Sequence, residues 1–221
     1  MPGRDGGWWC EAASGIFSGM RTQPTPDRVL ADLGDKFLEA LVDAVDGARA
    51  DLRLFQDWQP GWFVTFSNRF TANFLHERVW AVLVERVDEL DNVVVLDQEP
   101  HRQLFANAYV LRVKRHHPGD RISSYPTDGA LRFWSSEVTL PGLERVSLAL
   151  GYMWDADLRR VDDAVVSFRD ELDRPVWAVL VQRDAGGATG VSWTPVDPNL
   201  PEFDLSQVVD TPADGSGADP W

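Results

Sequence analysis

Apolar residues recur at intervals of three and four along the first part of the chain, which is the period of an amphipathic helix. One such stripe covers residues 30–55, and Thr25–Asp27 before it supplies an N-cap, a proline at the first helical position and a first-turn acid. Gly47 can divide this helix in two, and Pro60-Gly61 ends it. A second helix with the same period is expected from Ser67 to about residue 90.

After residue 91 the period of the apolar pattern changes from 3.6 to 2, the period of strands. The expected strands cover residues 92–96, 105–116, 146–152, 164–169 and 176–181. Strands that follow one another through short connections favour an antiparallel sheet. The order of elements predicts an α+β fold, in which an N-terminal helical pair or hairpin packs on one face of a mainly antiparallel sheet of about five strands.

Composition divides the chain into one domain and two tails. Residues 1–24 are rich in Gly, Ser and Pro without a sustained period, and they are predicted to be a disordered extension. Residues 184–221 hold seven acids and no Lys or Arg, which predicts a disordered acidic tail. Residues 25–183 are expected to form a single α+β domain, helical over 25–90 and strand-rich over 91–183.

The chain is strongly acidic, with 35 Asp and Glu against 21 Lys and Arg and a formal net charge of −14. This balance disfavours broad nonspecific binding to nucleic acid. Cys10 is the single cysteine, so no intramolecular disulfide can form, which fits a reducing compartment. No apolar run is long enough for a signal-peptide core or a transmembrane helix. We therefore expect a cytoplasmic protein without a membrane partner. Met20 lies just before the first expected helix, so translation can start at Met1 or at Met20.

One segment opposes the acidic balance. Residues 101–134 hold six Lys and Arg against two Asp. Four aromatic residues are interleaved among them: Tyr109, Tyr125, Phe133 and Trp134. Strand alternation puts Lys114 on one face, together with its neighbours at 112 and 116, and Arg115 on the other. The expected binding residues are Arg112, Lys114, Arg115, His116, Arg121 and Tyr125.

Three interpretations of this basic segment stay open. It can be a solvated strand face that the acidic helix or the acidic tail neutralises. It can contact nucleic acid, because cations suit phosphates and aromatic side chains suit base stacking. It can also dock an acidic protein partner.

No complete catalytic motif is present. His76-Glu77 begins like a zinc-peptidase helix, but Trp80 stands where the second histidine ligand is required. His101 and His116 are general acid–base candidates for RNA cleavage, without a defined partner constellation. Catalytic residues are therefore unknown, and the absence of enzymatic activity is the favoured expectation.

A metal-dependent nuclease-like enzyme is the alternative hypothesis. Asp97 and Glu99 follow one expected strand and Lys114 lies on the next, as in restriction-endonuclease-type sites. There two carboxylates hold Mg²⁺ and the lysine stabilises developing charge. The strand that carries Lys114 lacks its own acid, because position 112 is an arginine. Mg²⁺ is expected only under this alternative, and no cofactor otherwise.

Four short segments carry a resemblance to a known group of proteins. They are Asn73-Phe74-Leu75-His76-Glu77, Lys114-Arg115-His116, Ser124-Tyr125-Pro126-Thr127 and Leu150-Gly151-Tyr152. Over about residues 65–182 the chain resembles poorly characterised bacterial proteins encoded beside helix-turn-helix proteins with an ImmA/IrrE-type peptidase domain, in prophages and toxin–antitoxin modules. The resemblance brings no catalytic residues. It implies a small cytoplasmic regulatory, toxin-like or defence-associated protein with a protein partner, which agrees with binding of protein or nucleic acid through the basic strand.

Overall fold

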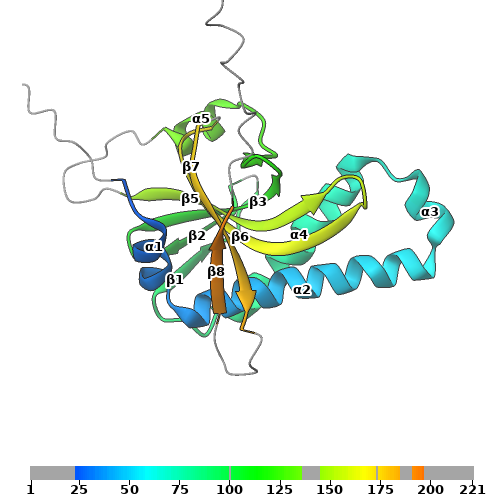
Figure 1. The fold of residues 1–221 in the computed structure, drawn as a ribbon, viewed down its shortest axis with the longest axis horizontal. Coiled ribbons are helices and arrows are strands. Elements are labelled where there is room, and N and C mark those ends of the chain that lie inside the picture. The colour runs from blue at the N-terminus through cyan, green and yellow to red at the C-terminus, as the bar shows by residue number, and fades with distance from the viewer. Residues whose placement is uncertain (1–22, 100, 136–144, 173, 185–190, 197–221) are drawn as a thin grey trace, which may run out of the picture.

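The computed structural model describes residues 23–99, 101–135, 145–172, 174–184 and 191–196. Helices lead the chain and an eight-stranded sheet follows (Figure 1). The helices are α1 (Pro26–Leu33), α2 (Asp35–Trp58), α3 (Pro60–Thr65), α4 (Asn68–Val87) and α5 (Asp128–Trp134). The strands are β1 (Val93–Leu96), β2 (Gln103–Ala106), β3 (Tyr109–His117), β4 (Arg121–Ile122), β5 (Val146–Asp155), β6 (Arg160–Glu171), β7 (Arg174–Arg183) and β8 (Val191–Pro195). None of the described helices combines the length and the apolar character needed to cross a membrane.

The sheet has the spatial order β1-β2-β3-β5-β6-β7-β8, and β4 pairs with β3 off this path. Neighbouring strands are antiparallel except β3 and β5, which run parallel from Tyr109↔Val146 to His116↔Met153. Parallel neighbours need a crossover connection. The segment that contains β4 and α5 supplies it. The predicted α+β class, with N-terminal helices and a mostly antiparallel sheet, is confirmed.

The expectation of about five strands is wrong for two main reasons. The segment 105–116, expected to be one strand, contains the end of β2, a two-residue turn and most of β3. Asn107 makes this turn with a φ of +51°, a conformation that asparagine tolerates better than most residues. The segment 191–195, in the range expected to be a disordered tail, forms β8 and pairs with β7. The other predictions for residues 1–22, 185–190 and 197–221 lie outside the described residues.

The main core lies between the sheet and helices α1, α2 and α4. Leu41 and Leu75 from the helices meet Leu111, Leu148 and other buried residues of the central strands. The first helix breaks at Gly34, whose φ is +81°. The break that the sequence suggests at Gly47 does not occur. That second glycine lies in continuous α2 and faces Val82 of α4, where an added Cβ atom would lie 3.7 Å from the valine side chain, an ordinary contact distance.

A second, smaller core covers the opposite face of the sheet. It contains Phe133 and Trp134 of α5 together with Ala149 and Leu172. Trp134 is only 1% exposed. The sequence pattern predicts helices on one face of the sheet only, and it predicts no helix within residues 101–134, so α5 is an addition to the expected fold. The spacing of the buried residues of α5 is too short to show a helical period.

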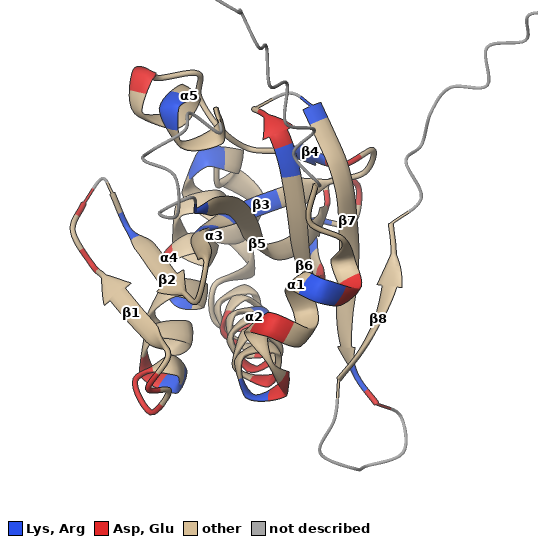
Figure 2. Cartoon of the chain, turned by 90° about the vertical axis from the view of Figure 1, so that its left-hand side faces the viewer, with Lys and Arg blue, Asp and Glu red and all other residues tan. Residues whose placement is uncertain are grey.

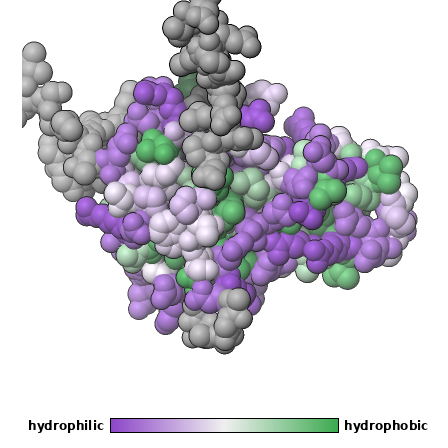
Figure 3. All heavy atoms as spheres, in the orientation of Figure 1, coloured by the Kyte–Doolittle hydropathy of each residue, from purple (hydrophilic) through white to green (hydrophobic). Residues whose placement is uncertain are grey.

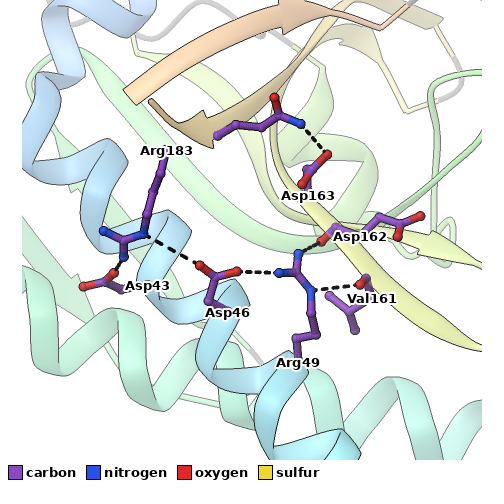
Figure 4. Close-up of polar contacts among 8 residues, drawn as sticks. Asp43, Asp46, Arg49, Val161, Asp162, Asp163 and Arg183 are labelled. Carbon is purple, nitrogen blue, oxygen red and sulfur yellow. Dashed lines mark hydrogen bonds and ion pairs between the residues drawn. The ribbon is translucent and has the colours of Figure 1, made fainter. Parts of the chain in front are cut away.

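Ion pairs and hydrogen bonds attach the acidic helix α2 to the sheet (Figure 4). Arg49 donates from Nε to the carbonyl of Val161 (3.0 Å) and from Nη2 to the carbonyl of Asp162 (2.6 Å). Arg183 of β7 pairs with Asp43 of the same helix. These arginines therefore form their ion pairs and hydrogen bonds with acids and carbonyl groups of the domain itself.

Candidate functional site

The edge of β3 that faces away from β5 has a gap. β2 pairs with it as far as Leu111, and β4 pairs with it from His116 onwards. Between them, no strand within the described residues pairs with positions 112–115. Two cavities of about 250 and 180 Å³ open at this gap, beside α4. We call the gap and its cavities the β3 notch. Its polar lining residues are Asn73, His76, Glu77, Glu99, Arg102, Arg112, Lys114, Arg115 and Ser123.

Lys114 lies at the centre of the β3 notch and lines both cavities. Its side chain is half-buried, and it forms no ion pair with an acid among the described residues. Burial and the neighbouring charge of Arg112 lower the pKa of the Lys114 ammonium group. The notch therefore holds a partly dehydrated cation that forms no ion pair with the described acids, although Glu77 and Glu99 line the same cavity.

Arg112 is held in place by two neighbours. Its guanidinium lies 3.9 Å from the centroid of the Phe133 ring. With the Gln103 amide oriented to satisfy its hydrogen bonds, the amide oxygen accepts from Nε (3.0 Å) and Nη2 (2.5 Å) of Arg112. Burial lowers the pKa of Arg112. Phe133, which the sequence offered as a stacking residue for bases, instead packs in the second core and supports this guanidinium.

Further cations lie on β3 and β4. Arg115 donates from Nε to Ser123 Oγ (3.1 Å), and its guanidinium lies 5.8 Å from the Trp154 ring centroid. Arg121 is exposed and is the strand partner of His117. Burial and the charges of these two arginines lower the pKa of His117. The strand pairing of β3 with β4 therefore concentrates positive charge at one edge of the sheet.

The cations of β3 and β4 are distinguished by lying close together without an ion pair to a described acid. Lys36, Arg53, Arg69 and Arg132 also form none within the described residues, but they lie on helices α2, α4 and α5. Ion pairs with acids of the described chain are made by Arg28, Arg49, Arg78, Arg86, Arg102, Arg160, Arg174 and Arg183. In that same part of the chain, Arg112, Lys114, Arg115 and Arg121 make none. Figure 2 shows basic residues on β3 and β4, and acidic residues gathered on α2. No acid of the described helices forms an ion pair with these four cations, although Glu77 of α4 lines the cavity beside Lys114. Residues 197–221 of the acidic tail lie outside the described residues.

His116 is not a surface binding residue, which corrects the sequence analysis. The side chain is 1% exposed, and Nε2 lies 2.9 Å from Ser167 Oγ of β6. Burial and the charge of Arg169 lower the pKa of His116 to about 3. The predicted strand alternation is right for positions 109–113, since Leu111 and Val113 are buried toward the helices. The error lies in taking the other face as solvent, because the second core covers part of it.

Tyr125 is exposed, at 86%, in the segment after β4. It is the one residue accessible for stacking among the four aromatic side chains that the sequence analysis interleaved with the basic residues. Tyr109, Phe133 and Trp134 are buried. Tyr109 instead donates its hydroxyl to Asp32 of α1 (2.7 Å).

The residues of the nuclease hypothesis are only partly brought together. Glu99 and Lys114 line the same cavity of the β3 notch, but Asp97 does not line it. Arg102 binds both acids and Glu77 of α4, at 2.9 Å from Asp97, 3.2 Å from Glu99 and 2.8 Å from Glu77. One guanidinium therefore faces three carboxylates and offsets only part of their negative charge. Among the described residues, no three His, Cys, Asp or Glu side chains are placed to hold a metal ion.

Helix α4 contributes residues that the sequence analysis did not assign to a binding site. Asn73 and His76 line the β3 notch from α4. Burial lowers the pKa of His76, with Glu77 raising it and Lys114 lowering it further. Asn73 and His76 are three residues apart, which puts both on one face of the helix. Such a polar pair, on a helix beside a basic strand, is the feature of the sequence that could have indicated their place in the site.

No protein-family model, curated protein or solved structure shows significant similarity to this chain.

Proposed function

We propose that this protein is a non-catalytic binding module that recognises an acidic segment of a protein partner through the β3 notch. The observation that carries this proposal is the group Arg112, Lys114, Arg115 and Arg121, which makes no ion pair with the described acids of a chain of net charge −14. Burial disfavours the charged forms of Arg112 and Lys114, and the charge of Arg112 adds to this effect at Lys114. A carboxylate bound in the notch offsets both effects, because its negative charge stabilises the charged forms of these side chains.

The notch is preorganised for carboxylates. Phe133 and Gln103 fix the orientation of Arg112, so its guanidinium loses little further freedom on binding. A guanidinium presents parallel N–H donors to a carboxylate, whereas Lys114 adds a compact charge beside it. The combination suits one or two Asp or Glu side chains of a partner.

Three observations favour a protein partner over nucleic acid. The net charge of −14 repels every anion, and the repulsion grows with the number of charges, so a segment with one or two carboxylates is disfavoured less than a phosphate backbone. Single-stranded nucleic acids are bound by rows of exposed aromatic side chains next to basic ones, but Phe133 and Trp134 are buried and Tyr125 stands without them. The notch is also confined to a short stretch of one strand edge, which fits a few side chains better than a long phosphate backbone.

The role we assign is that of a cytoplasmic regulatory partner protein in a toxin–antitoxin or defence-associated gene pair, as the resemblance implies. Mg²⁺ has no part in this function. The nuclease alternative receives less support, because Arg102 already binds Asp97 and Glu99.

Binding of a fluorescein-labelled synthetic peptide in which Glu alternates with Thr tests the proposal, by fluorescence anisotropy at low salt. The double variant Arg112→Ala/Lys114→Ala is expected to weaken binding at least about tenfold, which corresponds to about 1.4 kcal/mol. The matched control Arg160→Ala/Arg174→Ala removes the same charge from two exposed, ion-paired arginines and should bind almost as the unmodified protein.

Equal weakening in both double variants would reduce the effect to net charge and contradict a specific site. An oligoribonucleotide of equal charge serves as competitor. Tighter binding of the RNA than of the peptide, lost in Arg112→Ala/Lys114→Ala, would assign the notch to nucleic acid instead.

A further inference from the structure

The end of the α2–α3–α4 unit exposes a group of large apolar side chains. We call it the aromatic tip, formed by Leu54, Trp58, Trp62, Val64 and Phe70, which are between 44% and 74% exposed. The tip lies around α3, well away from β1 and β8 (Figure 1). Figure 3 shows hydrophobic side chains at this end of the molecule. The β3 notch does not include any of these residues.

The exposed rings form a continuous cluster. The ring centroids of Trp58 and Trp62 lie 5.9 Å apart, and Phe55 lies 6.1 Å from Trp58. Phe66 stacks on Phe55 at 5.4 Å and lies 4.1 Å from Phe70. Half-buried Phe55 and Phe66 thus connect the exposed tryptophans, Trp58 and Trp62, with exposed Phe70. The five rings form one surface.

The β5–β6 turn supports this surface from behind. Arg159 donates from Nη2 to the carbonyl of Phe66 (3.2 Å), and its guanidinium lies 4.7 Å from the Phe63 ring centroid. Leu158 of the same turn is 61% exposed and extends the apolar character beside α3. The aromatic tip is therefore a fixed apolar surface held by contacts from two parts of the chain.

The exposed area is large for a surface that faces only water. Large apolar and aromatic side chains carry about 150–250 Å² each, so the five residues leave roughly 600 Å² uncovered. This is the upper end of what monomeric proteins show in one patch. Two such patches facing each other bury about 1,200 Å² in total, which reaches the size of a specific protein interface.

We infer that the aromatic tip is the interface of a symmetric homodimer, in which it packs against the tip of a second copy of this chain. A symmetric contact requires a self-complementary surface. The chain next to the tip carries both signs of charge, since exposed Arg53 and Asp57 adjoin Leu54 and Trp58 in the sequence and exposed Arg69 adjoins Phe70. An anionic membrane fits less well, since the net charge of −14 repels it. The inference is independent of the function proposed for the notch.

Sedimentation velocity of the full chain over a dilution series tests the dimer. The unmodified protein is expected to sediment as a dimer that dissociates on dilution. Trp62→Glu should raise the dissociation constant at least about tenfold, because it places a charge in an apolar contact. The matched control is Val94→Glu, an equally drastic change at a 64% exposed residue of β1, and it should leave the dimer unchanged.

A chain that is monomeric at every concentration would overturn the inference, and so would a dimer that survives Trp62→Glu. If circular dichroism shows that Trp62→Glu does not fold, Trp58→Ala replaces it, with weaker dimerisation expected. Co-sedimentation with phosphatidylcholine–phosphatidylglycerol vesicles provides a further arm. A monomer whose vesicle binding is lost in Trp62→Glu would assign the tip to a membrane and overturn the dimer.

Discussion

Replacing Gly151 with alanine is expected to lower the free energy of unfolding by about 3 kcal/mol or more. Gly151 lies on β5 opposite Lys114 of β3 in the parallel register, with a φ of +152°. A Cβ atom at this position would lie 2.0 Å from the carbonyl oxygen of Lys114. No side chain can move aside to relieve this contact, because the clashing atom belongs to the backbone of the neighbouring strand. The two strands must separate, or the backbone must strain.

Urea unfolding monitored by circular dichroism measures this effect. Gly61→Ala is the matched control, since Gly61 lies in α3 and a Cβ atom there meets nothing within 4 Å. It should be neutral or stabilise the protein by up to about 1 kcal/mol. Equal stability of the two variants would show that β3 and β5 do not pair in this register.

The stability of the protein should also fall on acidification through His116. Its pKa is about 3 in the folded protein, against 6.5 for an ordinary histidine. The unfolded chain therefore binds a proton on this imidazole below about pH 6.5, whereas the folded chain does so only near pH 3. Protonation favours the unfolded state throughout this window, and below it the contribution no longer changes. Between pH 7 and pH 4 the loss is about 3 kcal/mol, since each unit of pKa difference corresponds to about 1.4 kcal/mol.

His116→Gln isolates this contribution from that of the carboxylates. Its amide does not titrate and can still hydrogen-bond to Ser167. Free energies of unfolding measured across the pH range should fall less steeply for the variant than for the unmodified protein, and the two should differ in slope between about pH 6.5 and pH 3. Parallel pH profiles would mean that the imidazole is not buried in its neutral form against β6.

Periodicity predicted the long elements well because their burial is one-sided. α4 begins after Ser67, whose hydroxyl accepts from the backbone N–H of Phe70, and the capping residue had indicated this start. The strands around residues 93–96 and 176–181 were also predicted. Short elements were missed, since α5 and β8 are too brief to establish a period. β8 was further obscured by a composition that is typical of disordered segments.

The candidate site was predicted in its charge but not in its shape. Arg112, Lys114 and Arg115 were singled out because they oppose the acidic balance of the chain. The notch itself arises because β2 ends before Arg112 and β4 begins after Arg115, and no local pattern encodes where two other strands stop. The ion pairs of Arg102 depend likewise on α4 lying beside the β1–β2 connection, a tertiary contact that a single sequence does not reveal.

A charge-swap experiment at Lys114 tests the central claim most directly, that the β3 notch binds acidic side chains of a protein. The full chain and Lys114→Glu are titrated with two synthetic peptides, one with Glu alternating with Thr and one with Lys replacing Glu. We expect the unmodified protein to bind the acidic peptide better and Lys114→Glu to shift this preference toward the basic peptide, with a coupling of at least about 1 kcal/mol in the double-mutant cycle. A coupling near zero, with Lys114→Glu keeping the affinity for the acidic peptide, would contradict the claim.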